Sequence, residues 1–317
     1  MAILLRAVRR PWAAALDIAR DWLLPSRALQ RRWWPPAIGL AYIATIGALG
    51  GLEGQHVLLG LLGLLDAYNE RTRAFLRAFF PFIVTGAIYD SLRYYLADGT
   101  AGRIHVAGPY LLDRAWFGIG GRTLNEVFAV HHWPIADLIA GFAYLLYVGE
   151  FLALAMIEFF AGRVAHAALF ARCFFAVNVL GFVTYFVYPA APPWYVAAHG
   201  FGPAQMTAAP SEAAAHRFDA LLGTQVFQNA YGHSVEVFGA IPSLHVAYPL
   251  MAAILAFSLR ELRWARWPAA LYVPVICFSA VYLQHHYIID VLIGLAYAGI
   301  VVVALLGHAR RRTAQAT

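Results

Sequence analysis

The sequence contains no lysine, and only 13% of its 317 residues are charged. Soluble domains typically carry about 25% charged residues, so the composition is not that of a soluble domain. All 23 basic residues are arginine, and they exceed the 17 acidic residues by 6. The two cysteines, Cys173 and Cys277, both lie in apolar runs, which argues against a disulfide framework or a cysteine zinc site. Hydrophobic residues make up 62% of the chain, and this indicates a polytopic membrane protein.

The N-terminal segment is basic and is repeatedly interrupted by polar residues. Its first 34 residues hold seven arginines, two aspartates and two prolines, a pattern unlike that of a secretory signal. A basic helix lying on an anionic cytoplasmic leaflet fits this pattern better. We therefore expect a basic amphipathic segment at residues 1–36, followed by an additional membrane or interfacial hairpin at 37–77.

Six later apolar runs are long enough to cross a bilayer of about 30 Å, at roughly 20 residues a crossing. They lie near residues 78–97, 134–160, 173–190, 243–259, 267–284 and 286–307. The sequence thus predicts an all-α fold with a six-transmembrane-helix core at 78–307 and a basic C-terminal tail at 308–317.

Arginine placement orients these spans, because basic residues gather on the cytoplasmic side of short loops. Most arginines fall on one side, in the N-terminal segment and in the short connections. The opposite side receives the two long connections, 98–133 and 191–242. We expect the protein to lie in a bacterial inner membrane, with this opposite face in the periplasm. The alternative is a membrane whose opposite face borders a lumen.

Histidines and an aspartate gather at this opposite face. In QHHYIID (284–290), His286 and Asp290 are spaced i, i+4, one turn apart on one helix face. The carboxylate can then hold one imidazole nitrogen and leave the other as a nucleophile. His245, which ends PSLH (242–245), lies at the same membrane depth and can protonate a leaving alkoxide. Two histidines and an aspartate, without a thiol or an activated serine, are typical of phosphoryl transfer through a phosphohistidine.

Two other interpretations of these residues stay open. Histidines at a membrane interface frequently serve as hydrogen-bonding anchors. Zinc binding by His285, His286 and Asp290 is chemically possible, although no HExxH or similar ligand spacing supports it. We expect neither a metal nor a cofactor.

The two motifs PSLH and HYIID resemble the second and third signatures of the type 2 phosphatidic acid phosphatase superfamily. The resemblance implies that His286 is the nucleophile, His245 the general acid and Asp290 the partner that orients His286. It also implies a six-helix catalytic core in which these motifs open the fourth and last helices.

Four segments together are similar to the inositol phosphorylceramide synthases of fungi and their bacterial relatives. These segments are APPWY at 191–195, RFDALLGTQ at 217–225, FGAIPSLH at 238–245 and QHHYIID at 284–290. That resemblance implies transfer of a phospho-headgroup, expected to be phosphoinositol, from a glycerophospholipid to a lipid alcohol such as ceramide. The expected partners are therefore a phospholipid donor, a lipid-alcohol acceptor and the bilayer, with no nucleic acid.

The chain departs from the superfamily in its phosphate clamp. Ala280 stands six positions before His286, where the phosphatases carry arginine, and no basic residue lies in 173–195. A phosphodiester carries one negative charge and a monoester nearly two, so the missing clamp favours headgroup transfer over monoester hydrolysis. The rival functions are a lipid phosphatase acting on phosphatidate, polyprenyl diphosphate or a phosphoinositide, and a non-catalytic lipid transporter on the same scaffold.

Eight further residues are candidates for binding the substrate. They are Asp90, Arg93, Arg114, Trp194, Tyr195, Arg217, Asp219 and Ser243. Arg217, Arg114 or Arg93 would supply the missing positive charge, and backbone amides around Ser243 would add donors. The alternatives are a solvated Arg217–Asp219 pair, a structural Asp90–Arg93 pair, and aromatic anchoring in the headgroup layer for Trp194 and Tyr195.

Overall fold

The computed structural model describes residues 34–48, 52, 54–92, 100, 102–232 and 237–316. The regular structure of these residues is helical, and β-bridges occur among them only as isolated pairs. The expected all-α fold is therefore confirmed for the described part of the chain. Of the predicted basic segment at 1–36, residues 1–33 lie outside the described residues.

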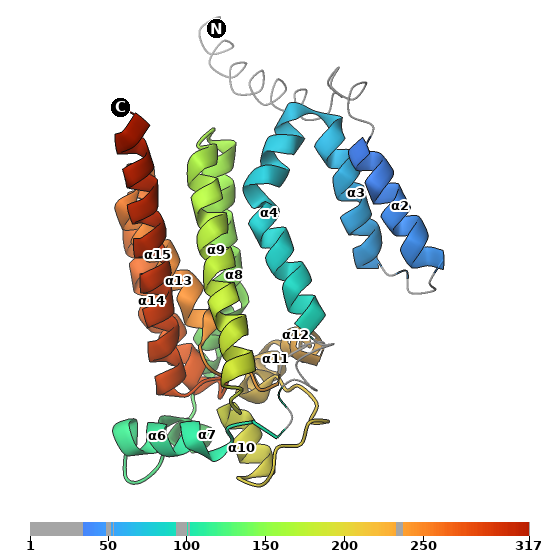
Figure 1. The fold of residues 1–317 in the computed structure, drawn as a ribbon. Helices are drawn as coiled ribbons and strands as arrows, with labels where there is room; N and C mark the ends of the chain where they lie inside the picture. The colour runs from blue at the N-terminus through green and yellow to red at the C-terminus, as the bar shows by residue number, and fades with distance from the viewer. Residues whose placement is uncertain are drawn as a thin grey trace, which may run out of the picture. The chain divides into compact units, whose positions relative to one another are not determined.

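The chain forms two compact units, and the boundary between them lies between Phe80 and Pro81. In the first unit, α2 (Trp34–Ala48) and α3 (Gly54–Tyr68) pack side by side as a helical hairpin (Figure 1). A Cβ at Gly39 would meet the carbonyl of Gly60, so the two backbones approach closely. Small residues at such contacts are typical of helices that pack within membranes. Membrane insertion of this hairpin stays a prediction.

Three helices of the second unit are long and apolar enough to cross a membrane. They are α8 (Pro134–Phe160), α9 (Val164–Val187) and, within α15 (Ile288–Ala316), the stretch up to Arg311. These helices identify an integral membrane protein. The predicted basic tail at 308–317 is a continuation of α15 up to Ala316.

The other three predicted spans correspond to helices that are shorter or more charged. α13 (Leu244–Ser258) and α14 (Arg266–Tyr282) have 15 and 17 residues, or about 22 and 26 Å at 1.5 Å per residue. α4 (Glu70–Ser91) is longer, but its first turns hold Glu70 and several arginines. The structure thus places a helix at each of the six predicted positions, of which three meet the length and hydropathy expected of a span.

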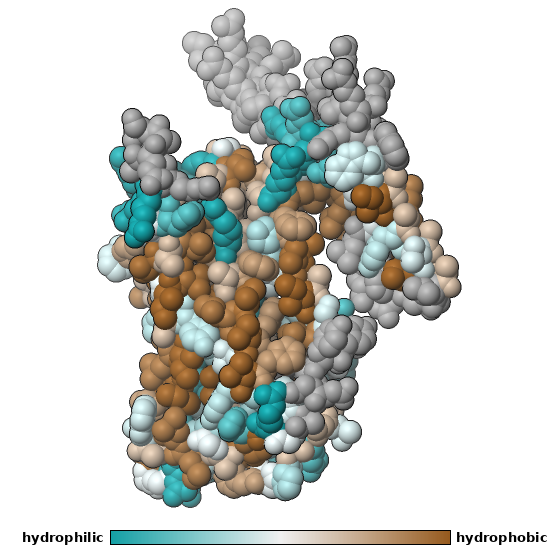
Figure 2. All heavy atoms as spheres, in the orientation of Figure 1, coloured by the Kyte–Doolittle hydropathy of each residue, from teal (hydrophilic) through white to brown (hydrophobic). Residues whose placement is uncertain are grey.

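An exposed apolar surface of the second unit lies along α9 and α15. Figure 2 shows a hydrophobic band there, with hydrophilic residues at the C-terminal end of α15. Leu180, Val183, Ile300 and Val303 are exposed on these two helices. A contiguous apolar surface of this kind is expected where a helix faces lipid.

α13 is the central helix of the second unit, since it packs against α8, α9, α14 and α15. Val246, Met251 and Leu255 on this helix are fully buried. A helix that is apolar on all sides is normally enclosed by other elements. The burial of α13 therefore fixes the position of its first residues relative to all four neighbours.

Shorter helices from the two long connections gather where α13 and α15 begin (Figure 1). They are α6 (Ala107–Phe117), α7 (Leu124–Val130), α10 (Pro193–His199), α11 (His216–Leu222) and α12 (Val226–Gly232). The stretch 110–128 forms parts of two helices, α6 and α7, rather than one continuous helix. The break occurs where Gly120 and Gly121 adopt φ of 59° and 79°, conformations that glycine tolerates and a helix does not.

Candidate active site

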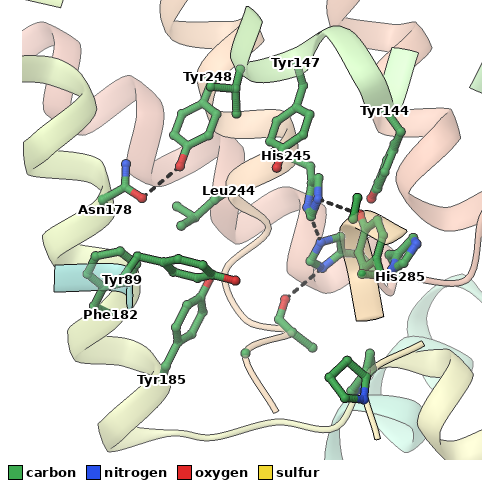
Figure 3. A pocket seen from close by; sticks show the side chains of 18 of the residues that line it. Tyr89, Tyr144, Tyr147, Asn178, Phe182, Tyr185, Leu244, His245, Tyr248 and His285 are labelled. Atoms are coloured by element: carbon green, nitrogen blue, oxygen red, sulfur yellow. Dashed lines mark hydrogen bonds between the residues drawn. The ribbon is translucent and has the colours of Figure 1, made fainter. Parts of the chain in front are cut away.

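His245 and His286 are in direct contact, although 41 positions separate them in the sequence. His245 is the second residue of α13, and His286 lies in the turn before α15. Nδ1 of His245 lies 2.9 Å from Nε2 of His286, as drawn in Figure 3. The structure therefore brings together the two imidazoles that the sequence predicts to share one phosphate.

Hydrogen-bond partners fix the proton positions on both rings when both are neutral. Nδ1 of His286 lies 2.9 Å from the carbonyl of Ala240 and must donate to it, because a carbonyl can only accept. Nε2 of His286 is then the acceptor for Nδ1–H of His245. Nε2 of His245 accepts in turn from the hydroxyl of Tyr231, at 3.3 Å. The lone pair of Nε2 on His286 is therefore the available nucleophile.

Asp290 lies beside His286 without hydrogen-bonding to it. Its Oδ2 is 3.7 Å from Nδ1 of His286 and accepts the N–H of Tyr287 at 2.8 Å. This corrects the expected carboxylate–imidazole hydrogen bond, because the carbonyl of Ala240 takes that position. Asp290 is fully buried, and its Oδ1 has no hydrogen-bond partner among the described residues. The carboxylate can thus act on the imidazole through its charge, while the backbone fixes the tautomer.

A tight turn between α14 and α15 positions the nucleophile. The N–H of His286 donates to the carbonyl of Ala280 at 3.0 Å, and Gln284 adopts a left-handed φ of 67°, which is unusual for a residue with a side chain. Asn125 of α7 stabilises this turn, since its side chain donates to the carbonyls of Val281 and His286 at 2.9 and 3.0 Å. The side chain of Gln284 donates to the carbonyl of Asn125 at 2.7 Å. Contacts from α7 therefore hold the turn in this conformation.

A close backbone contact joins the starts of α13 and α15. The N–H of Ser243 donates to the carbonyl of Asp290 at 3.0 Å. Gly294, one turn further along α15, lies against the carbonyl of Ser243, and a Cβ there would also meet Val246. This contact sets the distance between the two histidine-bearing segments.

Aromatic rings surround the imidazole of His245. Tyr144 stacks on it with 4.4 Å between ring centroids, and Tyr147 lies at 4.5 Å in a tilted arrangement. Tyr144 and Tyr231 also stack on His285, at 5.2 and 4.6 Å. Aromatic faces attract cations, so an imidazolium formed at His245 would lie against the rings of Tyr144 and Tyr147.

The two histidines line a cavity of about 730 Å³, a volume typical of small-molecule sites. Its polar part includes His245, His285 and His286. Its apolar part lies between α4, α8 and α9 and includes Phe82, Leu152 and others. The cavity therefore combines a polar reaction centre with space for a lipid chain.

The expected cationic clamp does not line this cavity in the described part of the chain, where the lining holds neither arginine nor carboxylate. Arg114 is exposed on α6, and Asp90 lies on α4 outside the lining. Arg93 lies outside the described residues. Among the residues that the structure describes, no group of three histidine, cysteine or acidic residues could hold a metal ion.

Arg217 is held away from the cavity by a buried carboxylate. Its Nε lies 2.8 Å from Oδ1 of Asp137, and its guanidinium lies over the ring of Tyr282, 4.8 Å from the centroid. The hydroxyl of Tyr282 donates to Asp137 at 2.9 Å. The solvated Arg217–Asp219 pair is therefore wrong, since Arg217 has a different and buried partner.

Asp219 has a structural position at the start of α12. Its carboxylate accepts the N–H groups of three successive residues, at 3.0 to 3.1 Å; they are Val226, Phe227 and Gln228. It therefore orients the helix that carries Tyr231, the residue that hydrogen-bonds to His245. Asp219 does not line the cavity; it affects the site only by positioning α12.

Of the predicted residues Trp194, Tyr195 and Ser243, only the first lines the cavity. Tyr195 is buried behind it and accepts the N–H of Gln205 at 2.7 Å through its hydroxyl. Ser243 is also buried outside the lining, and its Oγ has no hydrogen-bond partner among the described residues.

Two buried groups outside the spanning helices have shifted pKa values. Burial, and to a smaller extent the neighbouring His286, lower the pKa of His285 to about 3, so this ring is neutral at physiological pH. Burial raises the pKa of Asp113 on α6 to about 6. Oδ1 of Asp113 accepts the N–H of Ile289 at 3.1 Å, at the start of α15.

Several residues of the site were missed by the sequence analysis. They are Asn125, Tyr144, Tyr147, Tyr231, Ala240 and Gly294. The tyrosines resemble ordinary aromatic residues of apolar helices, and the role of Ala240 belongs to its backbone carbonyl. Gly294 follows Asp290 by one helical turn, and this spacing is the one signal that could have found it.

Comparison with known proteins places the site in a family context. The family model described as the PAP2 superfamily matches residues 110–304. A phosphoinositol dihydroceramide synthase of Bacteroides thetaiotaomicron is 36% identical over 265 residues, which cover 81% of this chain and 85% of that protein.

Fungal proteins match a smaller part of the chain. An inositol phosphorylceramide synthase catalytic subunit of Schizosaccharomyces pombe is 30% identical over 181 residues, 56% of this chain and 42% of that protein. An inositol phosphorylceramide synthase of Candida albicans is 31% identical over 178 residues, 55% of this chain and 37% of that protein. The aligned part therefore spans less than half of each fungal relative. No solved structure gives a significant match to the chain.

Proposed function

This chain belongs to the PAP2 superfamily, and from that membership we propose that it transfers phosphoinositol from phosphatidylinositol to ceramide or a similar lipid alcohol. The observation that carries the proposal is the contact of His245 with His286 at the wall of a lipid-sized cavity. The relatives named as phosphoinositol dihydroceramide synthase and inositol phosphorylceramide synthase support this choice of donor and acceptor.

The first half-reaction forms a phosphohistidine. Nε2 of His286 attacks the phosphorus, and the bond from phosphorus to the diacylglycerol oxygen breaks. His245 gives its Nδ1 proton to that oxygen, so diacylglycerol leaves as a neutral alcohol. Asp290 and the carbonyl of Ala240 stabilise the positive charge that develops on the His286 ring.

Protonated His245 also replaces the missing clamp. A diester carries one negative charge, and one imidazolium neutralises it. The stacked rings of Tyr144 and Tyr147 stabilise that imidazolium, and the hydroxyl of Tyr231 turns to accept its Nε2–H. One residue thus supplies both the charge and the transferred proton.

The second half-reaction releases the new lipid. His245 takes the proton of the ceramide hydroxyl, whose oxygen attacks phosphorus. The bond from phosphorus to Nε2 of His286 then breaks, and both imidazoles return to their starting protonation states. Neither half-reaction draws on a metal or a cofactor.

The resting arrangement requires one movement before catalysis. At 2.9 Å the two imidazole nitrogens leave no room for a phosphorus atom between them. We propose that the arriving phosphodiester displaces this hydrogen bond and separates the rings, as catalytic hydrogen bonds commonly rearrange when substrate binds.

The membrane placement follows from the arginine distribution. We propose that α4, α8, α9, α13, α14 and α15 all span a bacterial inner membrane, with the starts of α13 and α15 at the periplasmic side. Burial of α13 and α14 against their neighbours compensates for their short length. The lipid tails then lie in the apolar part of the cavity, while the headgroup meets the histidines.

An assay with labelled substrate distinguishes the proposed transferase from a lipid phosphatase. Purified protein is incubated with inositol-labelled phosphatidylinositol, with and without ceramide. The expected result is a new labelled lipid, formed only with ceramide and in equal amount to the diacylglycerol released. Free inositol phosphate without a new lipid would reject the transferase and leave the lipid phosphatase. Full turnover by His286→Ala would reject the covalent mechanism.

A further inference from the structure

Two buried polar atoms at the polar end of the cavity lack a hydrogen-bond partner among the described residues. They are the hydroxyl of Tyr144 and Nε2 of His285. Tyr144 is 2% exposed and His285 is 5% exposed, and both residues line the cavity. An unsatisfied buried polar atom destabilises a protein, so two of them beside one cavity call for a partner that the described residues do not supply.

Both atoms belong to rings that adjoin the reaction centre. Tyr144 stacks on the imidazoles of His245 and His285, with centroids 4.4 and 5.2 Å away, and His285 precedes the proposed nucleophile, His286. Figure 3 shows Tyr144, His245 and His285 grouped on one side of the cavity, away from Asn178 and Phe182. A ligand that reaches the two atoms therefore lies close to the imidazoles of His245 and His286.

The chemistry of this corner selects an uncharged headgroup. No carboxylate lines the described cavity, so an ammonium headgroup has no ion-pair partner there. Tyr144 stacks on His245, and Tyr147 lies tilted against it, so each of these two rings already has one face against that imidazole. A hydroxyl suits both orphaned atoms, since it can donate to one and accept from the other. A hydroxyl also satisfies Nε2 of His285 in either tautomer of the neutral ring.

We propose that Tyr144 and His285 form a hydroxyl-binding subsite, which holds ring hydroxyls of a polyol headgroup adjacent to the carbon that bears the phosphate. The subsite rests on the proposed function, because it presumes a phosphodiester bound at His286. It makes the Tyr144 hydroxyl and Nε2 of His285 determinants of donor specificity, and neither atom takes part in proton or phosphoryl transfer.

Phosphatidylinositol and its deoxy analogues test the subsite directly. In the inositol ring, the 2- and 6-hydroxyls flank the phosphate-bearing carbon. Tyr144→Phe removes only the orphaned hydroxyl, and we expect it to lower kcat/KM for phosphatidylinositol about five- to tenfold, the range of one hydrogen bond. On the analogue that lacks the contacted hydroxyl, 2-deoxy or 6-deoxy, wild type and Tyr144→Phe should have equal kcat/KM.

The matched control is Tyr248→Phe, which removes a hydroxyl from another wall of the same cavity. That hydroxyl is satisfied, since it donates to Asn178 at 2.8 Å. We expect Tyr248→Phe to keep the wild-type ratio of kcat/KM between phosphatidylinositol and both deoxy analogues. The same readout applied to His285→Gln should reproduce the loss of discrimination seen in Tyr144→Phe.

Thermal unfolding in lipid-free detergent gives a second, non-catalytic readout. Tyr144→Phe removes an unsatisfied buried group, so its Tm should equal or exceed that of wild type. Tyr248→Phe leaves the oxygen of Asn178 without its donor, so its Tm should fall. A lower Tm for Tyr144→Phe would show that its hydroxyl has a structural partner, and would overturn the subsite.

The outcomes separate this inference from the proposed function. If wild type makes no phosphoinositol lipid, the proposed function fails at once, before any variant is compared. If wild type is active and Tyr144→Phe loses the same factor on phosphatidylinositol and both deoxy analogues, the transferase stands and the hydroxyl subsite is wrong.

Discussion

Gly294 of α15 lies against the carbonyl of Ser243, the residue immediately before α13. This contact joins the two segments that carry the proposed catalytic histidines. The 2.9 Å contact between His245 and His286 therefore depends on the lack of a side chain at Gly294.

Gly294→Ala should separate the two segments. The added methyl group would meet the Ser243 carbonyl and Val246, and overpacking of this kind costs about 1–3 kcal/mol. We expect a fall in Tm and a loss of transfer activity of about a hundredfold, since displacement of a reacting group by about 1 Å has that effect. Gly299→Ala on the same helix is the control, because nothing lies within 4 Å of its Cβ position. Equal effects of the two variants would contradict this account.

Asp290→Asn should weaken the reaction without abolishing it. The carbonyl of Ala240 fixes the tautomer of His286, and an asparagine oxygen can still accept the N–H of Tyr287. The loss is then the charge 3.7 Å from the imidazole, and we expect a fall in kcat of about ten- to a hundredfold. Single-turnover labelling of His286 measures the step itself. A loss as complete as that of His286→Ala would mean that the carboxylate does more than supply charge.

Tyr231→Phe tests the residue that orients His245. Removal of its hydroxyl frees Nε2 of His245, and we expect kcat to fall about three- to tenfold. Hydrogen bonds to a charged group are the stronger ones, so the variant loses more stabilisation in the protonated form of His245. The decline of kcat/KM at alkaline pH should therefore begin at lower pH than in wild type. A reduced rate with an unchanged pH profile would indicate a packing effect only.

Asp113 should make stability depend on pH. Its pKa is about 6 in the folded protein and 3.8 in an unfolded chain, so the folded state holds the proton more tightly. The free energy of unfolding therefore falls as pH rises from about 4 to about 6 and stays lower above that range. Asp113→Asn keeps an oxygen for the N–H of Ile289 and removes the titration. Its Tm should vary less than that of wild type between pH 4.5 and 7, and parallel curves would contradict the assignment.

Arg217→Ala distinguishes a structural arginine from one that binds headgroup. The substitution leaves Asp137 buried without its cation, which costs about 3–5 kcal/mol when a buried pair loses one partner. We expect a large fall in Tm, an unchanged KM for phosphatidylinositol, and partial recovery of Tm in Arg217→Ala/Asp137→Asn. A raised KM with an unchanged Tm would restore Arg217 as a headgroup ligand.

The proximity of His245, His286 and Asp290 could be predicted from sequence, because their positions are local or fixed by membrane depth; their catalytic roles stay a prediction. Asp290 follows His286 by one helical turn, and PSLH begins a second apolar run at the same face. The substrate-binding residues were harder to predict. Arg217 carries the right charge, but its partner Asp137 lies on α8, 80 positions away in the sequence.

The walls of the cavity were not predictable from local patterns. Tyr144, Tyr147 and Tyr231 come from two helices, α8 and α12, and only packing brings them around His245. The amide of Asn125 gives no indication that it would hold the turn before α15. The contacts of Asn125, Tyr144 and Tyr147 join residues more than 80 positions apart, and hydrophobic periodicity does not predict them. Tyr231 is only 14 positions from His245, but no local pattern indicates that its hydroxyl faces the imidazole.

The sequence by itself determined that this is a membrane protein of helical fold, and it indicated which histidines to examine for phosphoryl transfer. Those follow from composition, run length and one-turn spacing, which are properties of neighbouring residues. Only the tertiary structure decided that a backbone carbonyl rather than a carboxylate hydrogen-bonds to His286 and that Arg217 pairs with a buried aspartate. It also decided that the Tyr144 hydroxyl and Nε2 of His285 line the cavity without a partner among the described residues. A hydrogen bond forms only within about 3.5 Å, and distances on that scale between remote segments are set by how the helices pack.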